Sequence, residues 1–174
     1  MEFYFIAHTA HTFIYFLFSE SLCKLGLKTG FIPDSAFSAS SELARAYKAS
    51  NARLDRQEIE VPLQVGAWLS ETNTVGEWLQ INLNNLTTIT GVITQARNTE
   101  LHWVTKFNID YKSEGNGNWN VVRDASSNTE FRGNQDNYIK KTNMFDQPVQ
   151  AIQIRLTVLE WQTRIALRLE YLTC

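Results

Sequence analysis

The sequence predicts an all-β fold, an antiparallel sandwich or barrel with at least seven short strands. Three observations lead to this prediction. Apolar and polar residues alternate in several separate runs, Gly-, Asn- and Ser-rich turn signals separate these runs, and helical periodicity is almost absent. A chain of 174 residues is expected to form one domain, and it is large enough to bury a core without a stabilising metal.

The strands are expected at the alternating runs. In the run that starts at Trp78, for example, Leu79, Ile81 and Leu83 alternate with polar positions. A Gly/Asn turn over 114–118 predicts a hairpin between two of the strands. The segment 40–49 is compatible with a helical turn capped by Ser40 or Ser41, but it is short and is interpreted as a loop. Six of the expected strands span 78–83, 87–97, 107–113, 119–124, 150–161 and 165–174.

Composition favours an extracellular protein and excludes some partners. Lys and Arg number 16 against 18 Asp and Glu, so no basic stripe is available for nucleic acid. Residues 1–21 hold an apolar stretch followed by Ser19 and Ser21, which is typical of a secretory signal peptide, although a mis-assigned or disordered leader fits too. The remaining residues, 22–174, form the expected domain. His8 and His11 lack the further ligands that a metal site requires.

The two cysteines, Cys23 and Cys174, bracket the expected domain. An even pair in a secreted domain favours a disulfide, and the competing interpretation is two separate buried thiols. Asn85 begins an Asn-Leu-Thr glycosylation acceptor sequence in an expected loop. An enzyme is not expected, because the chain carries none of the common catalytic motifs and its carboxylates are scattered.

Several blocks in order resemble the discoidin domain, also called the coagulation factor V/VIII C-type domain. They are "LGLKTGFIPDSAFSASS", "NARLD", "GAWLS…EWLQINL", "ITGVITQAR", "WVTKFNIDYKSEGNGNWNVV", "FRGNQDN" and "IQIRLTVLEW…IALRLEYLTC". The resemblance covers residues 23–174. It implies an eight-stranded antiparallel jelly-roll β-barrel, or β-sandwich, whose ends are joined by a Cys23–Cys174 disulfide, with ligand loops at one end.

The resemblance also implies roles for individual residues. Trp68 and Trp78 are expected to pack inside the barrel, and Arg155 and Arg168 to be hydrogen-bonded structural arginines. The ligand loops correspond here to residues 43–51, 70–74 and 97–103. The candidate ligand-binding residues on these loops are Tyr47, Asn73, Arg97, Glu100, His102 and Trp103.

Family members are mostly secreted or cell-surface modules that bind galactose-type sugars, anionic phospholipids, collagen or other proteins. We expect a secreted adhesion module that binds galactose-type glycans. Aromatic rings can stack on a sugar, while Arg97, Asn73 and Glu100 can form hydrogen bonds with the sugar hydroxyls. Phospholipid or extracellular protein binding is the alternative, disfavoured because the first and third loops offer few apolar residues beyond Tyr47 and Leu101. No cofactor is expected, a structural calcium ion is left open, and a homo-oligomer would raise avidity.

Overall fold

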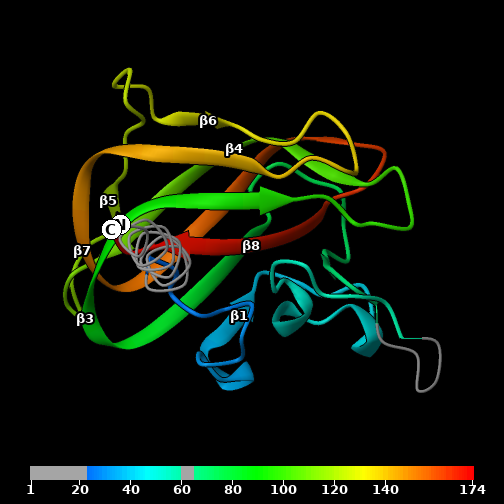
Figure 1. Ribbon diagram of the computed structural model, residues 1–174, viewed down its shortest axis with the longest axis horizontal. Helices are drawn as coiled ribbons and strands as arrows, with labels where there is room; N and C mark the ends of the chain where they lie inside the picture. Colours follow the sequence, from blue (N-terminus) through cyan, green and yellow to red (C-terminus); the bar gives the residue numbers. More distant parts are fainter. Residues whose placement is uncertain (1–22, 60–64) are drawn as a thin grey trace, which may run out of the picture.

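The computed structural model describes residues 23–59 and 65–174, which form a curled antiparallel sheet of eight strands (Figure 1). The expected signal peptide lies outside the described residues. Two strands, β3 and β7, are far longer than the others. The strands are β1 Phe37–Ala39, β2 Trp68–Leu69, β3 Trp78–Gln95, β4 Trp103–Lys112, β5 Asn120–Val121, β6 Glu130–Arg132, β7 Lys141–Gln162 and β8 Ala166–Leu172.

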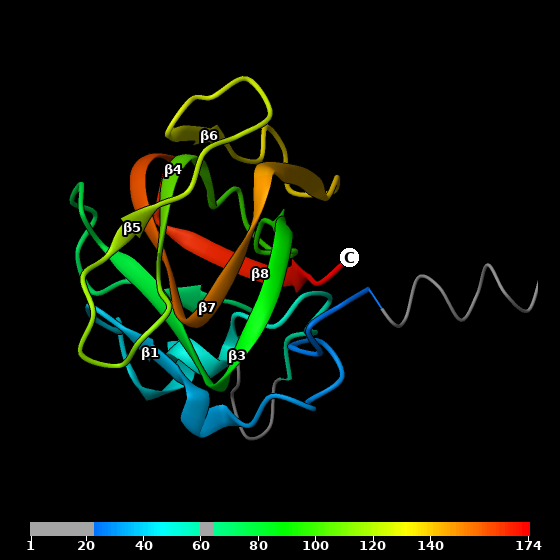
Figure 2. The same ribbon diagram turned by 90° about the vertical axis from the view of Figure 1, so that its left-hand side faces the viewer.

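Strands β3 and β7 bend so that each takes part in both layers of the barrel. The first part of β3 pairs with β1 and with the second part of β7, which in turn pairs with β4. The second part of β3 pairs with β8 and with the first part of β7. Strands β2, β5 and β6 extend the layers at their edges. Viewed from the end that carries the C-terminus, the strands curl around one interior (Figure 2).

The bend in β3 explains one error in the sequence prediction. Two strands were expected, over 78–83 and 87–97, yet a single strand runs through both, with its register against β7 shifted between Asn82 and Thr87. Asn84 adopts a φ of 62°, a conformation that asparagine tolerates better than most residues. The acceptor residue Asn85 therefore lies exposed on the bulge of a strand rather than in a loop.

The interior is filled by the apolar positions that the alternation indicates. Trp68 is fully buried and donates its indole N–H to the carbonyl oxygen of Ser41 at 3.0 Å, as expected for a core tryptophan. Trp78 is only half-buried, which corrects the expectation that it packs inside the barrel. Its ring instead lies against the guanidinium of Arg155, which also stacks on Trp119 and bonds Gln80.

Residues 24–28 pack against β8 and join the two ends of the described chain. Cys23 and Cys174 form the implied disulfide, with 5.0 Å between their Cα atoms. The fully buried carboxylate of Glu170 accepts hydrogen bonds from the backbone N–H groups of Gly26, Leu27 and Lys28. Burial raises the pKa of Glu170 although these N–H groups act in the opposite direction.

Short 3-10 turns replace the helical turn considered for residues 40–49. They are η1 Asp34–Ala36, η2 Arg45–Tyr47 and η3 Ala49–Asn51. Ser40 and Ser41 cap none of them and instead donate their hydroxyls to Glu77 at the start of β3. The predicted hairpin over the Gly/Asn turn is confirmed, since β4 and β5 pair across it.

Candidate functional site

The three expected ligand loops lie at the end of the barrel opposite the C-terminus. Figure 1 shows the 96–102 loop in green and the β7–β8 turn in orange-red at the right, with the C-terminus at the left. Hydrogen bonds tie the β7–β8 turn to loop 70–74, because Asn73 accepts the N–H of Ile165 and Glu71 accepts from Arg164. We call this end the rim, made of residues 43–51, 56–59, 70–74, 97–103 and 163–165.

Arg97 is held against Glu58 at the rim. Its side chain is only 11% exposed, and one guanidinium nitrogen lies 3.3 Å from a carboxylate oxygen of Glu58. Thr99 donates its hydroxyl to the same carboxylate, and Asn98 bonds the Gln57 side chain. Loop 97–103 and segment 56–59 are therefore joined through polar side chains, and Arg97 is less accessible than a freely projecting arginine.

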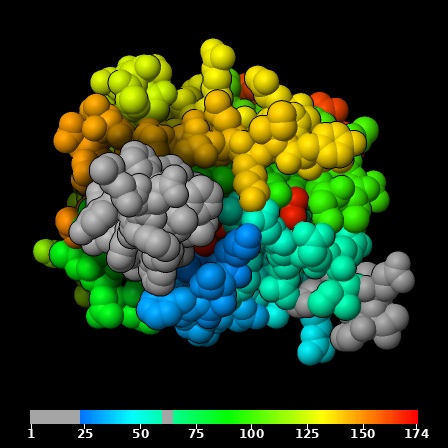
Figure 3. All heavy atoms as spheres, viewed as in Figure 1, coloured from blue at the N-terminus to red at the C-terminus, as the bar shows by residue number. Residues whose placement is uncertain are grey.

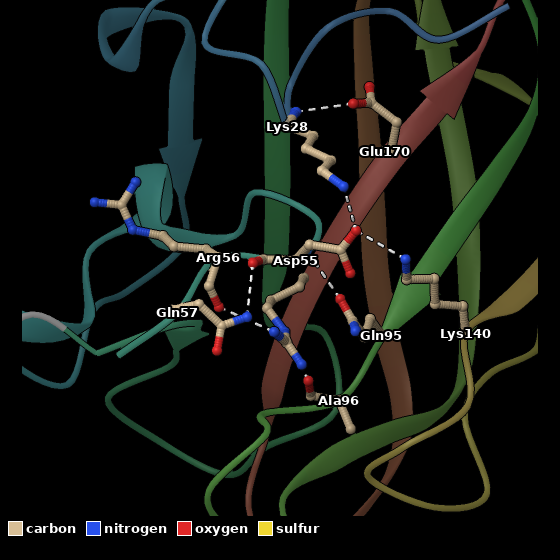
Figure 4. Close-up of polar contacts among 9 residues, drawn as sticks. Lys28, Asp55, Arg56, Gln57, Gln95, Ala96, Lys140 and Glu170 are labelled. Carbon is tan, nitrogen blue, oxygen red and sulfur yellow. Dashed lines mark hydrogen bonds and ion pairs between the residues drawn. The ribbon is translucent and has the colours of Figure 1, made fainter. Parts of the chain in front are cut away.

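Asp55 anchors the segment that carries Glu58. Lys28 and Lys140 reach its carboxylate at 2.7 and 2.8 Å, and its backbone N–H donates to Gln95 (Figure 4). Burial alone would raise the pKa of Asp55, but the hydrogen bonds and positive charges of the two lysines lower it to about 2. The carboxylate thus stays ionised at neutral pH and ties three separate segments together beneath the rim.

Arg168 supports the same segment from the barrel side. It is 1% exposed and donates to the carbonyl oxygens of Ala96 and Arg56. Burial lowers its pKa to about 10, so the group remains charged at neutral pH. Both Arg155 and Arg168 are therefore the structural arginines that the family resemblance implies.

His102 lies at the centre of the rim's positive charge. Burial lowers its pKa first, the charges of Arg97 and Arg164 lower it further, and Glu100 opposes them. The imidazole is consequently neutral at neutral pH, with one nitrogen available as an acceptor. Glu100 itself is exposed at the loop tip.

The two aromatic candidates differ in their surroundings. Tyr47 is half-buried and packs on a small apolar cluster that includes Leu69 and Ala166. Trp103 is half-buried at the start of β4, paired with Gln162. Each therefore presents only part of its ring to solvent.

Several buried polar atoms of the rim have no hydrogen-bond partner among the described residues. They belong to Arg56, Arg97, Asn98, His102 and Arg164. Four further atoms of this kind in the described residues lie outside the rim, on Thr94, Asn108, Asn134 and Tyr171. Buried polar groups in proteins are normally satisfied, so each of these atoms has hydrogen-bonding capacity that no described residue fills. Sequence reasoning missed Glu58 and Arg164. Arg164 carried a weak signal as a polar residue just before an expected strand, whereas nothing in the sequence pairs Glu58 with Arg97.

The described residues form neither a metal-ligand cluster nor a membrane-spanning helix. No three His, Cys, Asp or Glu side chains converge at the rim or elsewhere within residues 23–59 and 65–174. In the same ranges no helix has the length and apolar character needed to cross a membrane.

The chain is similar to known extracellular domains. Residues 36–171 match the family described as F5/8 type C domain. Mouse lactadherin is 35% identical over 162 residues, which cover 86% of this chain and 33% of that protein. Human retinoschisin is 35% identical over 130 residues, 74% of this chain and 56% of that protein. The chain thus spans less than two thirds of the length of either relative.

Solved structures share the fold at lower identity. Discoidin II from Dictyostelium discoideum superposes with a TM-score of 0.70 at 19% identity, covering 79% of this chain and 54% of that one. The family 32 carbohydrate-binding module of C. perfringens NanJ, solved with galactose, gives a TM-score of 0.58 at 22% identity, covering 81% and 96%. The eight-stranded jelly-roll prediction is confirmed by the observed strands and by these neighbours.

Proposed function

This chain belongs to the F5/8 type C, or discoidin, domain family, and from that premise we propose that it is an extracellular adhesion module that binds galactose-type glycans at its rim. The Cys23–Cys174 disulfide supports an oxidising, extracellular setting. The proposal assigns no catalysis to the rim, where no catalytic constellation is present among the described residues.

The observation that carries the proposal is the group of polar side chains from two loops that gathers around His102. Arg97, Asn98, His102 and Arg164 come from two loops and each has a buried polar atom without a partner in the described part of the chain. Sugar hydroxyls both donate and accept, so they match a cluster that offers guanidinium donors beside a neutral imidazole. Tyr47 and Trp103 border the cluster as partly exposed rings suited to stacking on a sugar face.

The structure of the galactose-bound NanJ module gives independent support, because that protein holds a sugar on the same fold. The identity of 22% restricts this support to the architecture.

One observation favours a second function, docking to an anionic phospholipid surface. Leu101 is 61% exposed at the tip of loop 97–103. On the neighbouring loop 133–140, Tyr138 and Ile139 are 81% and 69% exposed. Exposed apolar side chains beside cations are what interfacial anchoring requires.

A glycan array probed with the disulfide-bonded protein tests the main proposal. We expect signal on terminal galactose or N-acetylgalactosamine that free galactose competes away. His102→Gln and Arg164→Gln are expected to reduce it at least tenfold, because each removes a hydrogen-bonding group from the cluster. Parallel sedimentation with phosphatidylserine vesicles tests the lipid alternative, for which Leu101→Ser is the informative variant.

The matched control is Arg123→Gln, which removes one exposed arginine away from the rim. Its glycan signal should equal that of the wild type. Folded protein that gives a blank array, or a signal that both rim variants leave unchanged, would contradict glycan binding at the rim.

A further inference from the structure

Two adjoining hollows run beside β6 and share no residue with the rim. The larger has a volume of about 550 Å³ and is lined in part by Lys106, Arg123, Ser127, Asn128 and Arg132. The second, of about 280 Å³, continues from Arg132 to Asn134, Lys140 and Lys141. Figure 3, viewed as Figure 1, shows residues of this region in yellow and gold, exposed along the upper edge of the molecule.

Positive charge dominates the lining of the two hollows. Five cations, Lys106, Arg123, Arg132, Lys140 and Lys141, face the two carboxylates Glu130 and Asp136. Asp136 is occupied, because its carboxylate accepts the backbone N–H groups of Tyr138 and Ile139. The concentration contrasts with the net charge of −2 for the whole chain.

Some of these cations already have partners, and the others do not. Lys106 pairs with Glu160 and Glu130, and Lys140 pairs with Asp55. Arg132, Arg123 and Lys141 form no ion pair within the described residues, and all three are exposed. Arg123 donates only to the carbonyl oxygen of Ser127. Three unneutralised charges thus lie along one depression, with Arg132 at the junction of its two parts.

The floor of the depression is fixed by the backbone. The N–H groups of Gly133 and Asn134 donate to the carbonyl oxygens of Thr105 and Val104 at 2.8 and 2.9 Å. A Cβ atom at Gly133 would overlap the carbonyl oxygen of Val104, so the close approach requires glycine. Asn134 is buried and bonds the carbonyl oxygens of Thr94 and Ile139. The cations therefore project from a rigid surface.

The shape and lining select the class of ligand. Ile139 is the one large apolar side chain in the described lining, which is too little for insertion into a bilayer. The described lining also has no aromatic ring on which the bases of a single-stranded nucleic acid would stack. The hydroxyl and amide groups of Ser127, Asn128 and Thr129 suit sugar hydroxyls, while the free guanidinium groups suit sulfate or carboxylate. We propose that this depression binds a linear acidic polysaccharide, with Arg132 at the centre of the contact.

Immobilised heparin is the probe for the experiment. The wild-type protein should be retained, and Arg132→Gln should weaken binding about tenfold in low salt because one charge-assisted contact is lost. Lys141→Gln should act in the same direction. The affinity should fall steeply as salt rises, since polyanion binding releases counterions.

Arg45→Gln is the matched control, because Arg45 is exposed, forms no ion pair among the described residues and lies on the rim. It should leave heparin binding unchanged, and excess galactose should not elute the protein. An equal loss in Arg45→Gln and Arg132→Gln, or no retention of the wild type, overturns the proposal. Release of bound protein by galactose would place the contact at the rim and overturn it as well.

The assignment of a polysaccharide would be overturned if the protein bound phosphatidylserine vesicles more strongly than heparin and Arg132→Gln weakened that vesicle binding. Because the heparin variants and the glycan-array variants fall on different residues, either proposal can fail while the other stands.

Discussion

The buried charged groups of β8, Arg168 and Glu170, and the polar groups of the rim differ in how far their hydrogen bonds are satisfied. Along β8, Arg168 donates to two carbonyl oxygens and Glu170 accepts from three backbone N–H groups. At the rim, Arg97, His102 and Arg164 each keep a buried polar atom without a partner in the described residues. Satisfied groups hold segments in place, whereas unsatisfied groups retain the capacity to bind something else. The same residue types therefore serve stability at one place and, in the proposed function, recognition at the other.

Of the changes considered, removing the disulfide should lower the stability of the fold most. The Cys23→Ser, Cys174→Ser double variant opens a bond across 151 residues of sequence. On the chain-entropy estimate, the free energy of unfolding should fall by about 5 kcal/mol. Urea unfolding of the variant and of the oxidised wild type measures the difference. A fall of less than about 1 kcal/mol would contradict the expected role of the bond.

Glu170→Ala should have the next largest effect. It leaves the N–H groups of Gly26, Leu27 and Lys28 without their acceptor, at a cost of about 3 kcal/mol in the free energy of unfolding. Glu114→Ala, which removes an exposed carboxylate that forms no ion pair within the described residues, is the control and should change stability by less than about 0.5 kcal/mol. Equal losses of stability in the two variants would show that the three N–H contacts do not stabilise the fold.

Asp55 should make the stability of the folded protein depend on pH in the acid range. Its pKa is about 2 in the folded protein, below its ordinary value of 3.8, so its contribution is complete above about pH 4 and is lost as the pH falls toward 2. Asp55→Asn should therefore be less stable than the wild type at pH 6, with the difference shrinking toward pH 2. Thermal unfolding across that range measures both proteins, and a constant difference would contradict the assignment.

His102 should show the smallest effect on stability and the clearest effect on binding. Because its folded pKa is lowered, the unfolded chain binds a proton more readily, and stability should rise with pH through the window just below 6.5. His102→Gln should remove that slope while changing the free energy of unfolding at pH 8 by less than about 0.5 kcal/mol. Unfolding at several pH values tests the slope, and a slope retained in the variant would assign it to another group.

The strand pattern made the fold predictable, because alternation along β4 and the second part of β7 directly reflects one buried face. The sequence of β8 alternates in the same way, but both of its faces are buried. The edge strands β1, β2 and β6 escaped prediction since they contain only two or three residues each. The continuity of β3 also escaped, because a polar bulge with a positive φ at Asn84 looks like a loop in sequence.

The rim was predictable as a location but not as an arrangement. The family resemblance indicated loops 43–51, 70–74 and 97–103, and these loops do lie at one end. The pairing of Arg97 with Glu58 joins residues 39 positions apart through tertiary structure, which no local pattern reveals. For Trp78 the family resemblance implied burial, whereas the alternation placed it on the polar face with Gln80 and Asn82. The structure agrees with the alternation, since the ring is only half-buried and lies against Arg155.

The docking of residues 24–28 on β8 also has a consequence for biosynthesis. Gly26 and its acceptor Glu170 are 144 positions apart, so a ribosome makes one long before the other. During that interval residues 24–28 have been synthesised, but β8, on which they pack, has not. Completion of this domain must therefore follow synthesis of β8, and during elongation the nascent polypeptide depends on its surroundings to keep the unfinished barrel from associating with other chains.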